Sequence, residues 1–266
     1  MTGAGREEAE RAARSALWQA RSLWLLYLAA NLALVALAYG WLWIPDARAW
    51  QVAASLLLGL LLVLAFLWLQ GSTWAYFATV HGGAAGSLWT EFRGTLRLLP
   101  ALGMWALLVL LLYLGWSLAA EAVPGGALWL ASGLTYLIRK PVNPETVGAV
   151  LAAGSWVIGW ILIPLWLLPL GVGAAAGGSA AFRRSELRRV FKVCRRVRYW
   201  MSYVALFSLG VYLPTKLTLW VPAVESLWGQ AASLAARFLA AYLLFVTAWL
   251  LLCSLVARLR HDAGEG

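Results

Sequence analysis

Six long apolar segments constrain this chain more than any other feature of its sequence. Each is about as long as the roughly 20 apolar residues that a helix needs to cross the hydrocarbon core of a bilayer. They run approximately over Leu23–Ile44, Val52–Tyr76, Leu98–Ala120, Val147–Ala175, Trp200–Val221 and Leu234–Val256. The sequence therefore predicts an all-α, polytopic membrane protein with six transmembrane helices.

The overall composition agrees with a membrane protein and excludes several soluble classes. Hydrophobic residues make up 63% of the 266 residues and charged residues only 12%, whereas soluble domains carry about 25% charged residues. The two cysteines, Cys194 and Cys253, form no CxxC motif and no Cys/His cluster. A water-soluble enzyme, a disordered tail and a disulfide-rich secreted module are therefore excluded.

The charge pattern divides the chain into three parts. Residues 1–21 mix four Arg with three Glu and are predicted to form a cytoplasmic amphipathic segment, followed by the membrane domain over 22–258 and a cytoplasmic tail over 259–266. A seventh apolar stretch, Gly125–Ile138, is too short for a full crossing. It predicts an extracytoplasmic half-helix.

The distribution of basic residues predicts the orientation. With six spans, sixteen of the 21 Lys and Arg residues fall on the side that holds both termini. The positive-inside rule then places both termini in the cytoplasm. The excess of Arg over Lys is typical of a GC-rich bacterial genome, so we expect the bacterial inner membrane. The net charge of +10 is thereby a topology signal, and no nucleic-acid partner is predicted.

A weak internal similarity suggests a duplication. A gapless shift of 99 residues aligns Phe92–Leu114 with Phe191–Leu213 and gives seven identities. Both copies would share one orientation, which predicts a parallel repeat of 52–120 and 147–221. The alternative is that every entry into the membrane from the cytoplasm needs a basic, aromatic start.

Two segments are predicted to be in-plane amphipathic helices on the cytoplasmic side. From Phe182 to Trp200 apolar residues recur in steps of three and four, which places them on one helical face: Leu187, Val190, Phe191, Cys194, Val197 and Met201. Basic residues lie on or beside the other face: Arg184, Arg188, Arg189, Lys192, Arg195 and Arg196. The second, shorter helix covers Leu88–Leu99.

These basic residues are the predicted binding residues of the chain, for anionic membrane lipids or a cytoplasmic protein subunit. In the alternative interpretation they only fix the topology and anchor the spans. A short cytoplasmic helix between two spans resembles the coupling element of ATP-binding-cassette permeases in its architecture. The permease loop motif around Glu-Ala-Ala is not present, since Gly83-Ala84-Ala85-Gly86 lacks the acidic residue.

The search for chemistry yields no catalytic constellation. No GxSxG, HExxH or Walker motif occurs, and neither His81 nor His261 has metal-ligating neighbours at a suitable spacing. We therefore predict no catalytic residues, metal or cofactor, although Glu121 and Glu225 remain as an outer carboxylate pair that an enzyme could use.

Polar and helix-breaking residues inside the spans are expected to serve packing. Several polar residues are predicted to bond one helix to another: Asn31, Gln70, Ser72, Thr73, Ser155, Ser208 and Thr247. The fourth span is rich in Gly and Pro, which predicts a kink and close packing: Gly154, Gly159, Pro164, Pro169, Gly171 and Gly173.

Two functions from different classes follow from these features. The first is a non-enzymatic membrane component, either a permease-like part of a transport system or a scaffold that binds a cytoplasmic partner through Phe182 to Trp200. The alternative is a lipid-handling protein, a flippase or a membrane-embedded enzyme, which holds anionic lipid on the same basic residues.

Overall fold

The computed structural model describes residues 21–45, 47–83, 87–222 and 226–264. Within these ranges the chain is almost entirely helical and contains no strand, as the sequence predicts. The amphipathic segment expected over 1–21 lies outside the described residues apart from Arg21, and so does Glu225.

The first half of the chain forms two long helices and a short turn into a third. The elements are α2 (Arg21–Leu42), α3 (Ala49–His81), α4 (Leu88–Thr95), the 3-10 turn η1 (Leu96–Leu98) and α5 (Leu99–Glu121). Pro100 sits in the first turn of α5, where a missing N–H costs no helical hydrogen bond. The turn from α3 through α4 to α5 is called the α4 turn below.

The second half repeats a turn of this kind between longer helices. The elements are α6 (Val123–Ile138), α7 (Pro144–Val157), the π-helical η2 (Ile158–Leu162), α8 (Ile163–Gly177), the 3-10 turn η3 (Gly178–Phe182), α9 (Arg184–Cys194), α10 (Val197–Phe207), the π-helical η4 (Ser208–Tyr212), α11 (Leu213–Leu219) and α12 (Leu227–Asp262). The turn from α8 through α9 to α10 is called the α9 turn.

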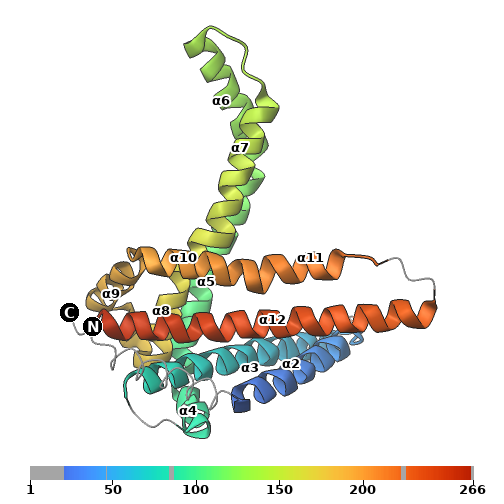
Figure 1. Ribbon diagram of the computed structural model, residues 1–266, viewed down its shortest axis with the longest axis vertical. Helices are drawn as coiled ribbons and strands as arrows, with labels where there is room; N and C mark the ends of the chain where they lie inside the picture. Colours follow the sequence, from blue (N-terminus) through green and yellow to red (C-terminus); the bar gives the residue numbers. More distant parts are fainter. Residues whose placement is uncertain (1–20, 46, 84–86, 223–225, 265–266) are drawn as a thin grey trace, which may run out of the picture.

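The helices are arranged in two directions (Figure 1). Helices α2 and α3, the α10–α11 stretch and α12 run alongside one another, while α5 and the α7–α8 stretch cross them steeply. The outer end of this crossing pair projects as a hairpin of α6 and α7 (Figure 1), whose helices pack mainly on each other. The end of α12 and helix α9 lie at the same end of the molecule.

Five helical stretches are long and apolar enough to cross a membrane. They correspond to five of the six predicted spans: Arg21–Leu42, Ala49–His81, Leu88–Glu121, Pro144–Phe182 and Leu227–Asp262. The sixth predicted span, Trp200–Val221, is helical from α10 through α11 and lies along α12. It is less apolar than the others, since Lys216 and several hydroxyl groups lower its hydropathy. The chain is thus a multi-pass helical protein of membrane type.

The predicted amphipathic helix Phe182–Trp200 is two helices, because the chain breaks at Arg195 and Arg196. The Trp200 indole N–H closes the break by donating to the Cys194 carbonyl at 2.6 Å. Val197 and Met201 consequently belong to α10 and do not extend the apolar face of α9. The expectation of one continuous interfacial helix is wrong in this respect.

The proline-rich fourth span is interrupted as expected, and its free carbonyls have partners. Proline has no N–H, so Pro169 leaves the carbonyl of Leu165, four residues earlier, without its helical donor. The Tyr199 hydroxyl of α10 donates to that carbonyl at 2.8 Å. Gly171 lies against the Trp74 ring so closely that a Cβ there would come within 2.7 Å of it. Gly159, Gly171 and Gly173 therefore serve close packing, as predicted, whereas a Cβ at Gly154 would meet no atom within 4 Å.

Some of the polar groups that were predicted to join helices do so, whereas Ser72 and Thr247 donate to carbonyls of their own helices. The Tyr27 hydroxyl of α2 lies 3.1 Å from Gln70 Oε1 and 2.9 Å from Thr73 Oγ1, both on α3. The Trp249 indole of α12 donates to the same Gln70 oxygen at 2.8 Å. Asn31 donates to the Tyr242 hydroxyl at 3.0 Å. These bonds hold α2, α3 and α12 together at one polar junction.

Candidate functional site

The most distinctive surface feature is a groove between α5, α8 and α9, with a volume of about 700 Å³. Its walls are mainly apolar side chains from three helices, joined by basic side chains from α9. The lining residues are Leu108 and Leu112 of α5, Trp166, Leu167 and Leu170 of α8, and Arg184, Leu187, Arg188, Val190, Phe191 and Lys192 of α9. We call this feature the α9 groove.

Three of the six predicted binding residues line this groove. Arg184, Arg188 and Lys192 follow one another in steps of four along α9, which places them in one row on the helix, about 6 Å apart. All three are exposed, and no carboxylate of the described residues pairs with them. The row therefore presents three cationic groups beside an apolar wall.

The other three predicted residues contact groups of the protein itself. Arg189 forms an ion pair with Glu186 at 2.9 Å, and Arg196 lies 3.9 Å from Asp262. The guanidinium of Arg195 lies over the Phe191 ring, 5.6 Å from its centre. The structure thus divides the six residues into a groove row and a group that faces the ends of α9 and α12.

An apolar strip of α9 fixes the helix to the rest of the protein. Val190, Val193 and Cys194 are buried. The Cys194 thiol faces the Leu165 carbonyl at 3.7 Å, and burial raises its pKa to about 12. The other two apolar residues of α9, Leu187 and Phe191, are exposed and line the groove, and the Phe191 ring lies against Trp166 with ring centres 5.6 Å apart. The apolar residues of α9 are therefore divided between packing against the protein and forming the groove wall.

A residue that the sequence analysis did not select holds α9 in place. Arg260, near the end of α12, forms an ion pair with Glu186 of α9 and donates to the Pro169 carbonyl at 2.9 Å. The guanidinium lies directly over Gly173, where any Cβ would collide with it. Glu186 is the only acidic residue of α9. This was the one feature of the sequence that could have indicated the contact with Arg260. This contact ties α8, α9 and α12 together.

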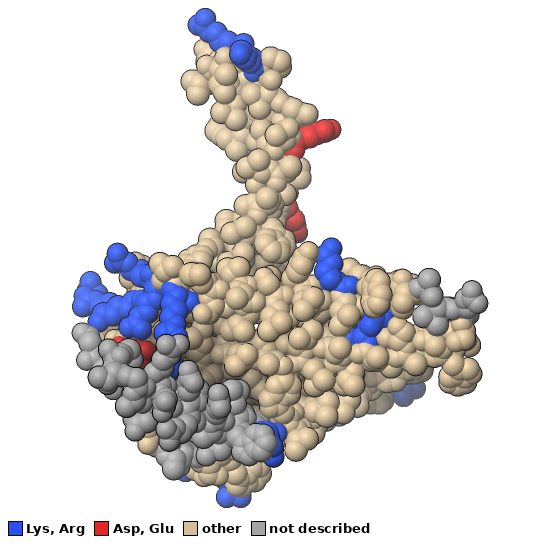
Figure 2. All heavy atoms as spheres, viewed as in Figure 1, with Lys and Arg blue, Asp and Glu red and all other residues tan. Residues whose placement is uncertain are grey.

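The surface view shows how the charges are distributed (Figure 2). Lys and Arg side chains gather at the end of the body where Figure 1 places α9, while the broad middle of this face carries few charges. Eight basic residues lie in this part of the chain, at the N-cap of α9, along α9, in the break after it and at the start of α10: Arg183, Arg184, Arg188, Arg189, Lys192, Arg195, Arg196 and Arg198. The groove therefore lies at the boundary between a basic end and an apolar surface.

Within the described residues the other sequence candidates form no second site. Glu121 is exposed at the end of α5, and its proposed partner Glu225 lies outside the described residues. The His81 ring lies 3.0 Å from the Ser254 hydroxyl, which connects α3 to α12. No group of three or more potential metal ligands occurs in the part of the chain that the structure describes.

Comparison with known proteins assigns the chain to no family. No protein-family model, curated protein or solved structure matches the chain significantly. The α9 groove is therefore the feature of the molecule that best indicates a function.

Proposed function

We propose that this protein is a membrane protein of the bacterial inner membrane, with both termini in the cytoplasm, whose α9 groove binds an anionic lipid. The observation that carries the proposal is the row of Arg184, Arg188 and Lys192 along the rim of an apolar groove. This row favours the lipid-handling alternative over the binding of a protein partner. Cationic groups that suit a phosphate and an apolar surface that suits acyl chains lie in one place.

The two walls of the groove suit the two ends of such a lipid. Leucine side chains of α5 and α8, together with the ring of Trp166, offer a surface for acyl chains. Arginine and lysine are donors without acceptors, and Arg binds phosphate oxygens in a bidentate manner. The groove therefore fits a phosphate at its rim and acyl chains along its floor.

The expected contribution of the row is large enough to measure. A basic side chain near an anionic membrane surface contributes about 1 kcal/mol. Three such residues contribute about 3 kcal/mol, which corresponds to roughly a hundredfold in affinity. This effect is electrostatic in part and is weakened by salt.

The test compares two triple variants with equal loss of charge. In the groove variant Arg184, Arg188 and Lys192 become Gln. In the control variant Arg183, Arg198 and Arg258, whose exposed side chains neither line the groove nor form an ion pair or ring contact with its lining residues, become Gln. Both are placed in phosphatidylcholine nanodiscs with a small fraction of phosphatidylglycerol, and bound lipid is counted by native mass spectrometry. We expect the groove variant to lose bound phosphatidylglycerol and the control to keep it.

Equal loss in both variants would overturn the proposal, since binding would then follow total charge. Retention by both variants would overturn it as well. Phosphatidylcholine bound as well as phosphatidylglycerol would show that the rim does not select for charge.

The same experiment also tests a second function. The exposed basic residues outside the groove support the scaffold or permease-like hypothesis, in which a cytoplasmic protein subunit binds this end of the molecule. A stoichiometric protein that is recovered with the unmodified chain and the groove variant, but lost with the control variant, would favour it.

A further inference from the structure

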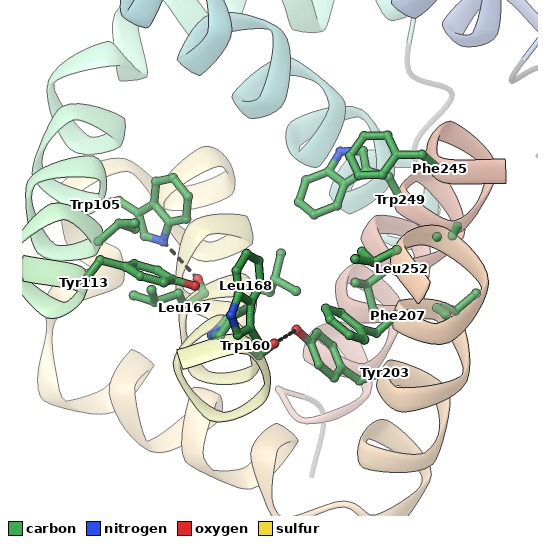
Figure 3. A pocket seen from close by; sticks show the side chains of 16 residues that line it. Trp105, Tyr113, Trp160, Leu167, Leu168, Tyr203, Phe207, Phe245, Trp249 and Leu252 are labelled. Atoms are coloured by element: carbon green, nitrogen blue, oxygen red, sulfur yellow. Dashed lines mark hydrogen bonds between the residues drawn. The ribbon is translucent and has the colours of Figure 1, made fainter. Parts of the chain in front are cut away.

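A second cavity lies on the other face of the α5–α8 contact. Its volume is about 300 Å³, and it is bounded by α5, by η2 with α8, by α10 with η4, and by α12. Figure 3 shows Trp105 and Tyr113 on one side, Phe245 and Trp249 on the opposite side, and Trp160 between them. Leu167 alone lines both this cavity and the α9 groove. The two spaces are therefore neighbours with separate linings.

The lining of this cavity is neutral and unusually aromatic. None of its sixteen lining residues is charged, and seven of them are Trp, Tyr or Phe. Aromatic rings prefer offset-stacked or edge-to-face contact with other rings, which stabilises a pair by about 0.5–1.5 kcal/mol beyond the burial of its area. The lining therefore favours a ring over a flexible chain.

Three polar side chains of the lining donate to backbone carbonyls of the protein. Tyr203 donates to the Trp160 carbonyl at 3.1 Å, and Tyr113 donates to the Gly159 carbonyl at 3.0 Å. Pro164 cannot supply an N–H to either carbonyl, four and five residues earlier, so the two hydroxyl groups replace it. The Trp105 indole donates to the Leu167 carbonyl at 2.9 Å. These donors are thus engaged before any ligand arrives.

Both π-helical segments found in the described residues lie at this cavity. Trp160 belongs to η2, and Gly210 and Val211 belong to η4. Single π-helical turns occur frequently at functional sites, because the extra residue per turn redirects side chains and breaks the regular backbone bonding. Two such turns beside one cavity indicate that the cavity is a functional feature of the fold.

We infer that this cavity binds a neutral, flat, ring-containing lipophilic molecule. Its volume is at the lower end of the range of about 300–1,000 Å³ that small-molecule sites have. An apolar pocket of this kind accepts apolar ligands, because water would find few hydrogen-bond partners there. A charged or strongly hydrogen-bonding ligand would leave its polar groups unsatisfied and is excluded.

The experiment uses pyrene as a flat neutral probe and hexadecane as a flexible apolar probe. The thermal midpoint of the full-length protein in mild detergent is measured with increasing amounts of each. The filled variant is Val109→Trp, which places a large ring in the cavity, and the matched control is Val150→Trp, at a position on α7 that is 67% exposed. Saturating pyrene is expected to raise the midpoint of the unmodified chain and the control by about 5 °C. The filled variant is expected to show no shift.

Stabilisation of the filled variant by pyrene would overturn the inference, because binding would then lie elsewhere. A saturable shift with hexadecane and none with pyrene would overturn the ring specificity. Val211→Trp fills the cavity from η4 and replaces Val109→Trp if that variant does not fold. The groove variant should keep the full pyrene response, so a failure of the lipid proposal leaves this inference testable.

Discussion

The α4 turn and the α9 turn are built alike but packed differently. In each, a short helix follows a long one and carries a Phe that meets a Trp of the long helix. In the α4 turn Phe92 is only 4% exposed, its ring centre lies 5.3 Å from that of Trp68, and its carbonyl accepts the Trp68 indole N–H at 2.7 Å. In the α9 turn Phe191 is 48% exposed. The first turn is closed and the second leaves a groove.

The size of the side chains on the preceding helix explains this difference. At the α4 turn, α3 presents Gly71, where a Cβ would collide with Leu102 and lie 3.0 Å from Thr95 Cγ2. At the α9 turn, α8 presents Trp166 and Leu170, which line the groove. A residue without a side chain lets helices approach closely, whereas large residues hold them apart. A change of a few side chains thus turns a packed corner into a binding surface.

The largest expected effect compares the two phenylalanines. Phe92→Ala removes a buried ring and should lower the free energy of unfolding by about 3 kcal/mol. Phe191→Ala removes a half-exposed ring and should lower it by less than about 1 kcal/mol. Denaturant unfolding of both variants in the same detergent checks this. Similar losses of stability would show that the two turns are packed alike.

A second prediction concerns the contact that fixes the α9 turn. Arg260→Gln breaks the ion pair with Glu186 and leaves that carboxylate half-buried without its partner, so we expect a loss of about 2 kcal/mol. Arg258→Gln is the matched control, because Arg258 is exposed on the same helix. The double variant with Glu186→Gln should lose less than the sum of the two single variants. Additive losses would mean that the two side chains act independently.

The sequence was sufficient to predict the class of fold and most of the helices. Apolar runs long enough to cross a bilayer predicted the long helices, and the basic runs predicted where charges concentrate. The split of the helix over Phe182–Trp200 was missed, because the apolar periodicity continues through Arg195 and Arg196. Periodicity reports which face is apolar and does not report where a backbone turns.

The site was predictable only in part, for a related reason. The sequence selected six basic residues, and three of them line the groove. The groove itself depends on Leu108, Leu112 and Trp166, which belong to other helices. Their contact with α9 arises from the tertiary fold and cannot be predicted from a local sequence pattern. The proposed duplication of 52–120 and 147–221 stays a prediction.

A smaller effect should follow from the prolines that distinguish α8 from α3. Helix α3 contains no proline, so nothing at the α4 turn requires a bond like that from Tyr199 to the carbonyl freed by Pro169. Tyr199→Phe removes the hydroxyl and should cost about 1 kcal/mol. Tyr212→Phe, at an exposed position of η4, should cost nothing measurable. Equal thermal midpoints of the two variants would contradict this account.

The smallest expected effect is a change in the reactivity of Cys194. Burial raises the pKa of its thiol to about 12, so the reactive thiolate is scarce at neutral pH. In a Cys253→Ala background, N-ethylmaleimide should label the folded protein at pH 7 far more slowly than the SDS-denatured chain. Arg260→Gln frees the start of α9 and should increase the labelling rate several-fold, while Arg258→Gln should not. Because a raised pKa keeps the thiol neutral, labelling of the folded chain should stay slow up to mildly alkaline pH. Fast labelling of the unmodified fold at pH 7 would mean that the buried strip of α9 does not rest on α8, and that the α9 turn is open on both of its faces.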